Sequence, residues 1–281
     1  MRYLKHEPLL YFAETAGNTL AWYCSDDKKN YKKMDSPKWQ YHNSAGNLLY
    51  KFNRLGYRTV ELDNLPKDYI LVFGCSYTEG VGLYDNEIWC HRLGNELGIP
   101  IVNLAKAGTG PDILNFNTQL FIKNNFAKPR AVINQWPQVN RKTFGYMHKE
   151  GLRLEDRNVH CIEALDDDDP TRRYELLDSK WYFKRWAMEE GQQEYEGAVH
   201  INSVTNIWNA YNIPVLNWTF DSDYKTRFNT NLYKSVTLAH NEIYGTDKKI
   251  LIDRARDNAH DGPDIHNQVV EQLRDDITCM I

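Results

Sequence analysis

A serine in a glycine-flanked turn is the first residue of the chain whose setting suits catalysis. Ser76 lies in the segment 74–80, which follows the apolar run 68–73. A serine on a tight turn at the carboxyl end of a strand presents its hydroxyl next to backbone N–H groups. Such a turn suits a nucleophile and its oxyanion hole. A phosphate-binding turn or a purely structural one is the alternative interpretation.

A histidine with a carboxylate three residues before it lies near the other end of the chain. Asp257 and His260 follow the apolar run 249–253. The carboxylate can accept the Nδ1–H of the imidazole, which leaves Nε2 free to act as a base. The spacing alone is weak evidence, and its value depends on the fold bringing His260 to Ser76.

Donors for a developing oxyanion follow two further apolar runs. Gly108 lies in the glycine-containing segment 103–110, and a glycine lets the backbone N–H approach a ligand closely. Side-chain amides come after the run 131–135, at Gln138 and Asn140, and Asn134 lies inside that run. Any of these amides could supply a further donor.

These residues must be positioned by the elements that precede them. Apolar, β-rich runs predict strands at 68–74, 101–104, 131–135, 213–218 and 249–253. Amphipathic spacing predicts helices at 86–97, 112–126, 200–210 and 263–277, the first of them capped by Asp85. Strands that alternate with helices indicate a parallel sheet covered on both faces, an α/β/α sandwich of three layers. Such sheets bind ligands at the carboxyl ends of their strands.

The rest of the chain surrounds this alternating pattern. Residues 1–66 predict an N-terminal extension of loops and short hairpins that wraps the core of a domain spanning 67–281. The segment 141–200 is rich in charged residues, and we interpret it as a helical insertion that docks through Trp181 and Trp186.

At the blocks around Ser76, Gly108 and His260, the sequence resembles the SGNH (GDSL-type) family of esterases and acyl hydrolases. The family block Gly-Asp-Ser-x-x-x-Gly resembles 74–80, with Cys75 where Asp is usual. The second-block glycine falls on Gly108, and the last block, Asp-x-x-His, matches Asp257 and His260. The resemblance covers about residues 53–138 and 205–278.

This resemblance implies a fold and a set of roles. The fold would be flavodoxin-like, with a five-stranded parallel sheet, and no cofactor or metal would be needed. Ser76 would be the nucleophile, His260 the base and Asp257 the residue that orients it. The backbone N–H groups of Ser76 and Gly108 would hold the oxyanion. The third block, Gly-x-Asn-Asp, is not matched, and Gln138 would stand in for its asparagine.

Composition excludes several other classes of protein. A net charge of −4, from 34 basic and 38 acidic side chains, leaves no electrostatic basis for nucleic-acid binding. No apolar run reaches the ~18 residues of a membrane span, and the first residues carry no secretory signal. The five cysteines lack Cys-x-x-Cys spacing, which indicates reduced thiols in a cytoplasmic protein.

For several other residues we favour a structural role over a functional one. Cys75 is expected to be a packed thiol and not the nucleophile. The run 166–169 is expected to be a solvated acidic loop, because it lacks the spacing of a calcium site. A metal site built from Asp253, Asp257, His260 and His266 is the weaker alternative to His266 packing or hydrogen-bonding beneath the triad.

The sequence therefore predicts a serine esterase acting on small acyl esters, foremost O-acetyl esters, with carbohydrate as a candidate alcohol. Trp136 and Asn140 are expected to contact substrate. Trp136, Trp181 and Trp186 are candidates for stacking on a sugar, although packing in the core or in a lid is the more common role of such tryptophans. One alternative is a non-catalytic carbohydrate-binding or structural module on a degenerate SGNH fold. Another is an acyltransferase.

Overall fold

The computed structural model describes residues 2–3, 9–34, 38–44, 47–139, 141–148, 151–158, 190–220, 233–237, 242–244, 249–251 and 253–281. Its centre is a five-stranded parallel sheet with the order β5-β4-β6-β9-β10. The strands are β4 (Ile70–Phe73), β5 (Ile101–Asn103), β6 (Ala131–Gln135), β9 (Val215–Phe220) and β10 (Lys234–Val236). Numbered along the chain, this order is 2-1-3-4-5, the flavodoxin-like arrangement.

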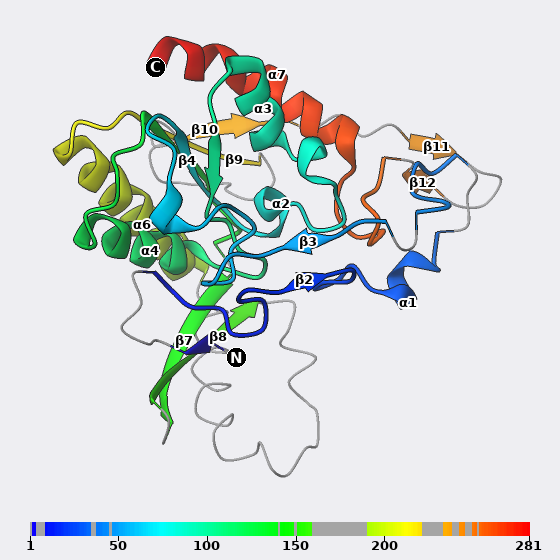
Figure 1. Ribbon diagram of the computed structural model, residues 1–281, viewed down its shortest axis with the longest axis horizontal. Helices are drawn as coiled ribbons and strands as arrows, with labels where there is room; N and C mark the ends of the chain where they lie inside the picture. The colour runs from blue at the N-terminus through cyan, green and yellow to red at the C-terminus, as the bar shows by residue number, and fades with distance from the viewer. Residues whose placement is uncertain are drawn as a thin grey trace.

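Helices cover both faces of the sheet. Helices α4 (Pro111–Lys123) and α6 (Glu190–Ala210) pack against each other on one face, and α3 (Trp89–Leu97) and α7 (Pro263–Met280) pack together on the other (Figure 1). Alternate residues of β4 enter the two cores, because successive side chains of a strand point to opposite faces. Leu71 and Phe73 lie in the core beneath α4 and α6, and Ile70 and Val72 in the core beneath α3 and α7. The predicted three-layer α/β/α fold is confirmed.

The fifth strand of the sheet is not the predicted one. Residues 249–253 were expected to form it, but β12 (Lys249–Leu251) pairs antiparallel with β11 (Glu242–Tyr244) in a separate two-stranded sheet. The edge position belongs to β10, which has β9 as its neighbour. An edge strand needs less apolar surface than a central one. In β10, Val236 is buried while Ser235 is exposed.

The predicted helix cap at Asp85 is also wrong. A short 3-10 turn, Asp85–Glu87, precedes α3, which begins at Trp89 after Ile88 as its N-cap. The Asp85 carboxylate forms an ion pair with Arg58 at 2.6 Å instead.

The N-terminal part of the chain contributes to both cores. It contains β2 (Thr19–Leu20) paired antiparallel with β3 (Tyr50–Lys51), the short helix α1 (Lys28–Tyr31) and a 3-10 turn at Leu62–Asn64. Phe12 and Tyr57 pack in the core beneath α4 and α6, and Trp39 and Tyr41 in the core beneath α3 and α7. Strands β2 and β3 lie below α2 (Ser76–Glu79) in the view of Figure 1.

The segment 141–200 begins with strands and not with the predicted helix. Strands β7 (Arg141–His148) and β8 (Gly151–Asn158) form an antiparallel hairpin, to which β1 (Arg2–Tyr3) adds a third strand. Helix α6 then starts at Glu190, ahead of the predicted start near His200. Trp181 and Trp186 lie outside the described residues, as does the acidic run 166–169. No helix within the described ranges is long and apolar enough to cross a membrane.

Candidate active site

Ser76 is presented by a tight turn between β4 and α2. The strand ends at Phe73 and the helix begins at Ser76, whose side chain is recessed, with 8% of the residue exposed. Gly74 makes this turn possible, because a Cβ there would lie 2.5 Å from the Oγ1 of Thr78. The left-handed Gly80, with φ of 77°, then ends the helix. The strand and the tight turn are as the glycine-flanked segment predicted, whereas the short helix α2 was not predicted.

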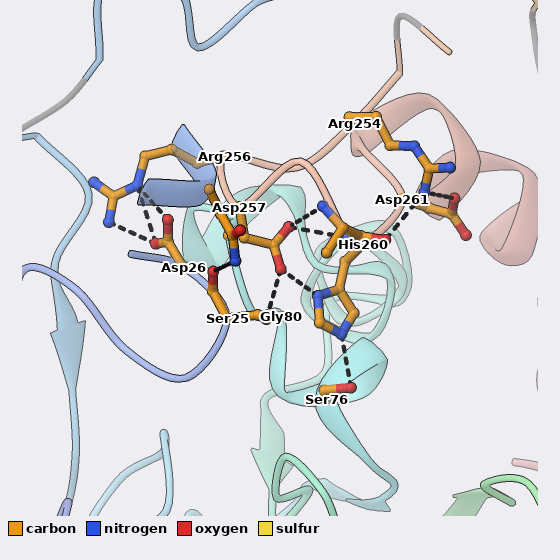
Figure 2. A network of polar contacts seen from close by, with 12 residues as sticks. Ser25, Asp26, Ser76, Gly80, Arg254, Arg256, Asp257, His260 and Asp261 are labelled. Carbon is orange, nitrogen blue, oxygen red and sulfur yellow. Dashed lines mark hydrogen bonds and ion pairs between the residues drawn. The ribbon is translucent and has the colours of Figure 1, made fainter. Parts of the chain in front are cut away.

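Three side chains form one hydrogen-bonded series, which we call the triad (Figure 2). The Nε2 of His260 lies 2.8 Å from the Oγ of Ser76. The Nδ1 of the same imidazole lies 2.5 Å from the Oδ2 of Asp257. The structure therefore brings together three residues that the sequence placed at opposite ends of the chain.

Asp257 is buried, with 1% exposed, and surrounded by donors. Its Oδ1 accepts the backbone N–H groups of Ala259 and His260 at 3.0 and 2.9 Å, and its Oδ2 accepts the hydroxyl of Ser25 at 2.7 Å. Burial raises the pKa of this carboxyl, but the hydrogen bond and charge of His260 and the two backbone donors outweigh it and lower the pKa to about 2. Asp257 is therefore ionised at neutral pH.

The charge of Asp257 decides which nitrogen of His260 carries the proton. An ionised carboxylate only accepts hydrogen bonds, so Nδ1 must be the protonated nitrogen. The Nε2 atom is then the acceptor for the hydroxyl proton of Ser76. In this arrangement the serine proton faces a base that is already oriented to receive it.

Gly108 lies beside the nucleophile turn, in what we call the oxyanion loop (residues 104–109). The loop is tied to the turn by the Lys106 N–H, which donates to the carbonyl of Gly74 at 3.1 Å. Gly108 itself is exposed, has φ of 77°, and has nothing within 4 Å of where a Cβ would stand. Within the described residues, neither its N–H nor that of Ser76 donates to an acceptor of the protein. Both donors are thus left for an incoming group.

The aromatic and amide residues after β6 are placed differently from the prediction. Trp136 is fully buried and its indole Nε1 donates to the Oδ1 of Asn217 at 2.9 Å. The prediction that Trp136 contacts substrate is therefore wrong. Asn134 is also fully buried and donates to the same oxygen at 3.0 Å, which excludes it as the alternative oxyanion donor. A tryptophan at a strand end can fill the core as readily as line a site.

A different amide from β6 reaches the nucleophile turn. The Oε1 of Gln135 accepts the N–H of Cys75 at 3.1 Å and the hydroxyl of Thr78 at 3.2 Å. It fixes the turn as an acceptor, and it is not aimed at an oxyanion. Gln138 is half-buried and its role as an oxyanion donor stays a prediction, while Asn140 lies outside the described residues.

Cys75 and His266 have the packing roles expected of them. The Cys75 thiol is buried and 3.2 Å from the Oε1 of Gln135. The Nδ1 of His266 accepts the N–H of Trp89 at 3.0 Å, and its ring stacks on Tyr77 at 4.1 Å between centroids. Burial lowers the pKa of His266 well below its usual value, so this imidazole is neutral.

Two residues of the alternative metal site, Asp253 and His266, are engaged with other partners. The carboxylate of Asp253 accepts the N–H groups of Asp264 and Ile265, at 3.2 and 2.7 Å, and so caps the first turn of α7. No group of three potential metal ligands occurs in the part of the chain that the structure describes.

Two buried ion pairs support the site, and sequence reasoning missed both. Asp26 and Arg256 are fully buried, and the guanidinium Nε lies 3.0 Å from both carboxylate oxygens. Lys106 and Glu79 are equally enclosed, with 3.2 Å between Nζ and Oε1. Glu79 also accepts the N–H of Ala107 at 2.6 Å, which links the helix of Ser76 to the oxyanion loop. Only the position of Glu79, three residues after the serine, offered a signal for this role.

Comparison with known proteins gives likeness in architecture only. No protein-family profile matches the chain, and no curated protein matches it in sequence. A solved acylhydrolase from Bacteroides fragilis is 11% identical with a TM-score of 0.39, covering 78% of this chain and 92% of that one. An acetyl xylan esterase from the rumen bacterium Butyrivibrio proteoclasticus is 13% identical with a TM-score of 0.39, covering 76% and 66%. A carbohydrate esterase family 2 enzyme from Corynascus thermopiles is 17% identical with a TM-score of 0.38, covering 79% and 68%.

Proposed function

We propose that the protein is a serine hydrolase of SGNH type that cleaves small acyl esters through an acyl-enzyme. The observation that carries the proposal is the unbroken series from the Oγ of Ser76 through His260 to Asp257, with separations of 2.8 and 2.5 Å. A nucleophile, a base within reach of it and a carboxylate that orients the base are what acyl transfer requires.

In the first half of the reaction, the Oγ of Ser76 attacks the ester carbonyl while its proton passes to the Nε2 of His260. The ionised Asp257 stabilises the imidazolium that forms. The backbone N–H groups of Ser76 and Gly108 donate to the oxyanion of the tetrahedral intermediate. His260 then returns the proton to the leaving alkoxide oxygen, and the alcohol departs from the acyl-enzyme.

In the second half, water takes the place of the alcohol. His260 removes a proton from the water as its oxygen attacks the acyl carbonyl, and the same oxyanion donors act again. When the intermediate collapses, the proton returns to the Oγ of Ser76 and the carboxylic acid leaves. The protein's own side chains supply every proton transfer in this scheme.

We further propose small acyl groups, foremost acetyl, as the substrate class, with a carbohydrate hydroxyl as the alcohol. The recessed position of Ser76 favours a small acyl group, since 8% of the residue is exposed. Trp136 gives no support to a carbohydrate substrate, because its side chain is buried. The cytoplasmic location expected from the cysteines is a prediction, and the four described cysteines are unpaired.

The test is hydrolysis of 4-nitrophenyl acetate against the octanoate, followed by release of acetate from an acetylated monosaccharide. We expect the acetate ester to be preferred and Ser76→Ala to abolish turnover. Cys75→Ala is the matched control, because it removes the neighbouring nucleophile and should keep most of the activity. A folded wild type that cleaves no ester would favour the non-catalytic module. Transfer to an added alcohol in preference to water would identify an acyltransferase.

A further inference from the structure

We propose that Ser25, from the N-terminal part of the chain, is a positioning residue of the triad. The inference rests on the proposed function, because it assigns a role in the same reaction. Ser25 lies 232 residues from Asp257 in the sequence, yet its hydroxyl donates to the Oδ2 of that carboxylate at 2.7 Å (Figure 2). No motif in the sequence pointed to this contact.

The hydroxyl of Ser25 completes the set of donors around Asp257. The Oδ1 atom takes the two backbone N–H groups of Ala259 and His260. The Oδ2 atom takes His260 Nδ1–H and the Ser25 hydroxyl. Each oxygen therefore has two partners, and the carboxylate is held against rotation about its Cβ–Cγ bond. Without Ser25, the oxygen that orients His260 would keep only the imidazole itself.

The residue after Ser25 fixes the same two segments in register. Asp26 forms its buried ion pair with Arg256, the residue immediately before Asp257. Two consecutive residues of one segment thus contact two consecutive residues of the other. The N-terminal segment and the triad loop (residues 254–260) can shift only together, since both contacts would have to break.

A third segment closes this network behind the triad. The hydroxyl of Tyr50 donates to Asp26 at 2.5 Å and accepts the N–H of Gly82 at 2.8 Å. The carbonyl of Gly82 in turn accepts the N–H of Arg256 at 2.9 Å. The turn that follows the helix of Ser76 is therefore tied to both partners of the ion pair.

The backbone of Ser25 is held independently of its hydroxyl. Its carbonyl accepts the side-chain amide of Asn30 at 2.7 Å, and Asp26 stays anchored by Arg256. Removing only the Ser25 hydroxyl should therefore leave the segment in place and take away one donor from Asp257. This separates positioning of the triad from support of the fold.

The experiment measures kcat and KM for 4-nitrophenyl acetate in Ser25→Ala and Ser25→Thr. Loss of a hydrogen bond to an ionised group should lower kcat in Ser25→Ala by roughly tenfold, with KM changed less than about twofold. Ser25→Thr keeps the hydroxyl and should recover activity to within about threefold of the wild type. Ser203→Ala is the matched control, because that hydroxyl donates to Asn115 on α4, at 3.3 Å, and should leave kcat unchanged.

The melting temperature shows that the change acts on the triad and not on the fold. It should fall by no more than about 5 °C in Ser25→Ala, the shift expected for the loss of one hydrogen bond to an ionised group. If that variant does not fold, the isosteric Ser25→Cys, whose thiol is a weak donor, replaces it. An active wild type with equal kcat in Ser25→Ala, a rise in KM alone, or no rescue by threonine would overturn the inference. An inactive wild type would instead refute the proposed function.

Discussion

The triad loop contacts Ser76, and the oxyanion loop contacts the turn and the helix that carry Ser76, but the two loops differ in how enclosed their key residues are. Each has a buried ion pair behind it, Arg256 with Asp26 for the triad loop and Lys106 with Glu79 for the oxyanion loop. The triad loop presents the carboxylate of Asp257, which is 1% exposed and has four donors around it. The oxyanion loop presents Gly108, which is exposed and has nothing within 4 Å of where a Cβ would stand.

This difference separates the parts of the site that exist before substrate arrives from those that substrate completes. Asp257, His260 and Ser76 already contact one another, so the proton path needs no rearrangement. The N–H of Gly108 has no acceptor among the described residues, and in the proposed reaction it would gain one when the oxyanion forms. In the proposed reaction, the half that is already assembled would hold the base, and the open half would admit the ester.

The two ion pairs also differ in the cation. Arg256 presents a planar fork to Asp26 and lies 4.1 Å above the ring of Trp22. Lys106 is a point charge that donates to Thr15 and Gly56, both at 2.9 Å, and lies near three aromatic rings. The fork fixes direction as well as distance, which suits the loop whose residue must orient an imidazole.

The largest effect should come from neutralising the half that is already assembled. Asp257→Asn is expected to lower kcat by about 10⁴-fold, because an amide can stabilise the wrong tautomer of His260. Gly108→Ala, which displaces one oxyanion donor, should cost about 10²–10³-fold. Steady-state kinetics on 4-nitrophenyl acetate measures both. Equal losses in the two variants would contradict the division between a prebuilt and a substrate-completed half.

Breaking either ion pair tests whether the two anchors are equivalent for the fold. Arg256→Met and Lys106→Met should each lower the free energy of unfolding by about 3–5 kcal/mol, since each leaves a buried carboxylate unpaired. Urea denaturation gives the values. Pairing Lys106→Met with Glu79→Gln should recover part of the loss, because no charge then stays without a partner. A single variant as stable as the wild type would show that its pair does not anchor its loop.

Two left-handed glycines compare how tightly the two loops are packed: Gly82 lies against the triad loop, and Gly108 lies in the oxyanion loop. Gly82 and Gly108 have φ of 82° and 77°, so alanine at either costs about 1–2 kcal/mol in backbone strain. A Cβ at Gly82 would also lie 2.7 Å from the Cβ of Ala255, whereas one at Gly108 would meet nothing. Gly82→Ala should therefore lose about 1–3 kcal/mol more than Gly108→Ala in thermal or urea unfolding. Equal losses of unfolding free energy in the two variants would mean that the triad loop accommodates an added methyl group as easily as the oxyanion loop does.

The smallest effect is a pH dependence from His266 of α7, whose ring stacks on Tyr77, the residue after Ser76. The pKa of His266 is well below 6.5 in the folded protein, because burial disfavours its charged form. In the unfolded chain it binds a proton below about pH 6.5, so stability is present above that pH and is lost as the pH falls. The loss should approach about 1.4 kcal/mol per pH unit relative to His266→Gln. Parallel stability curves from pH 7 to 5 would contradict this.

Most of the fold follows from local patterns, and its exceptions lie where local pattern is weakest. The apolar runs that form the central strands β4 and β6 are buried throughout, where continuous hydrophobicity is required, and those of β5 and β9 are buried in part. The run 249–253 is also rich in apolar residues, but its first three residues form β12 in a small antiparallel sheet. Strand β10 occupies the edge of the sheet with one buried residue, Val236, and so short an apolar pattern does not predict a strand.

The site divides in the same way. Ser76 was suggested by its glycine-flanked turn at the exit of β4. Asp257 and His260 were suggested by their spacing and by the resemblance to the last family block, because the strand expected before them lies outside the main sheet. Ser25 and Asp26 could not be found, because their partners lie more than two hundred residues away and burial of a polar residue leaves no local mark. The burial of Lys106 could not be predicted either, because lysine is usually a surface residue.

The most direct test of the account is covalent labelling of Ser76. The folded protein would be treated with a fluorophosphonate, and the adduct located by peptide mass spectrometry beside Ser76→Ala and Cys75→Ala. We predict one adduct, on Ser76, in the wild type and in Cys75→Ala, and none in Ser76→Ala. A folded wild type that takes up no label, or a label carried by another residue, would contradict the claim that this serine is an activated nucleophile.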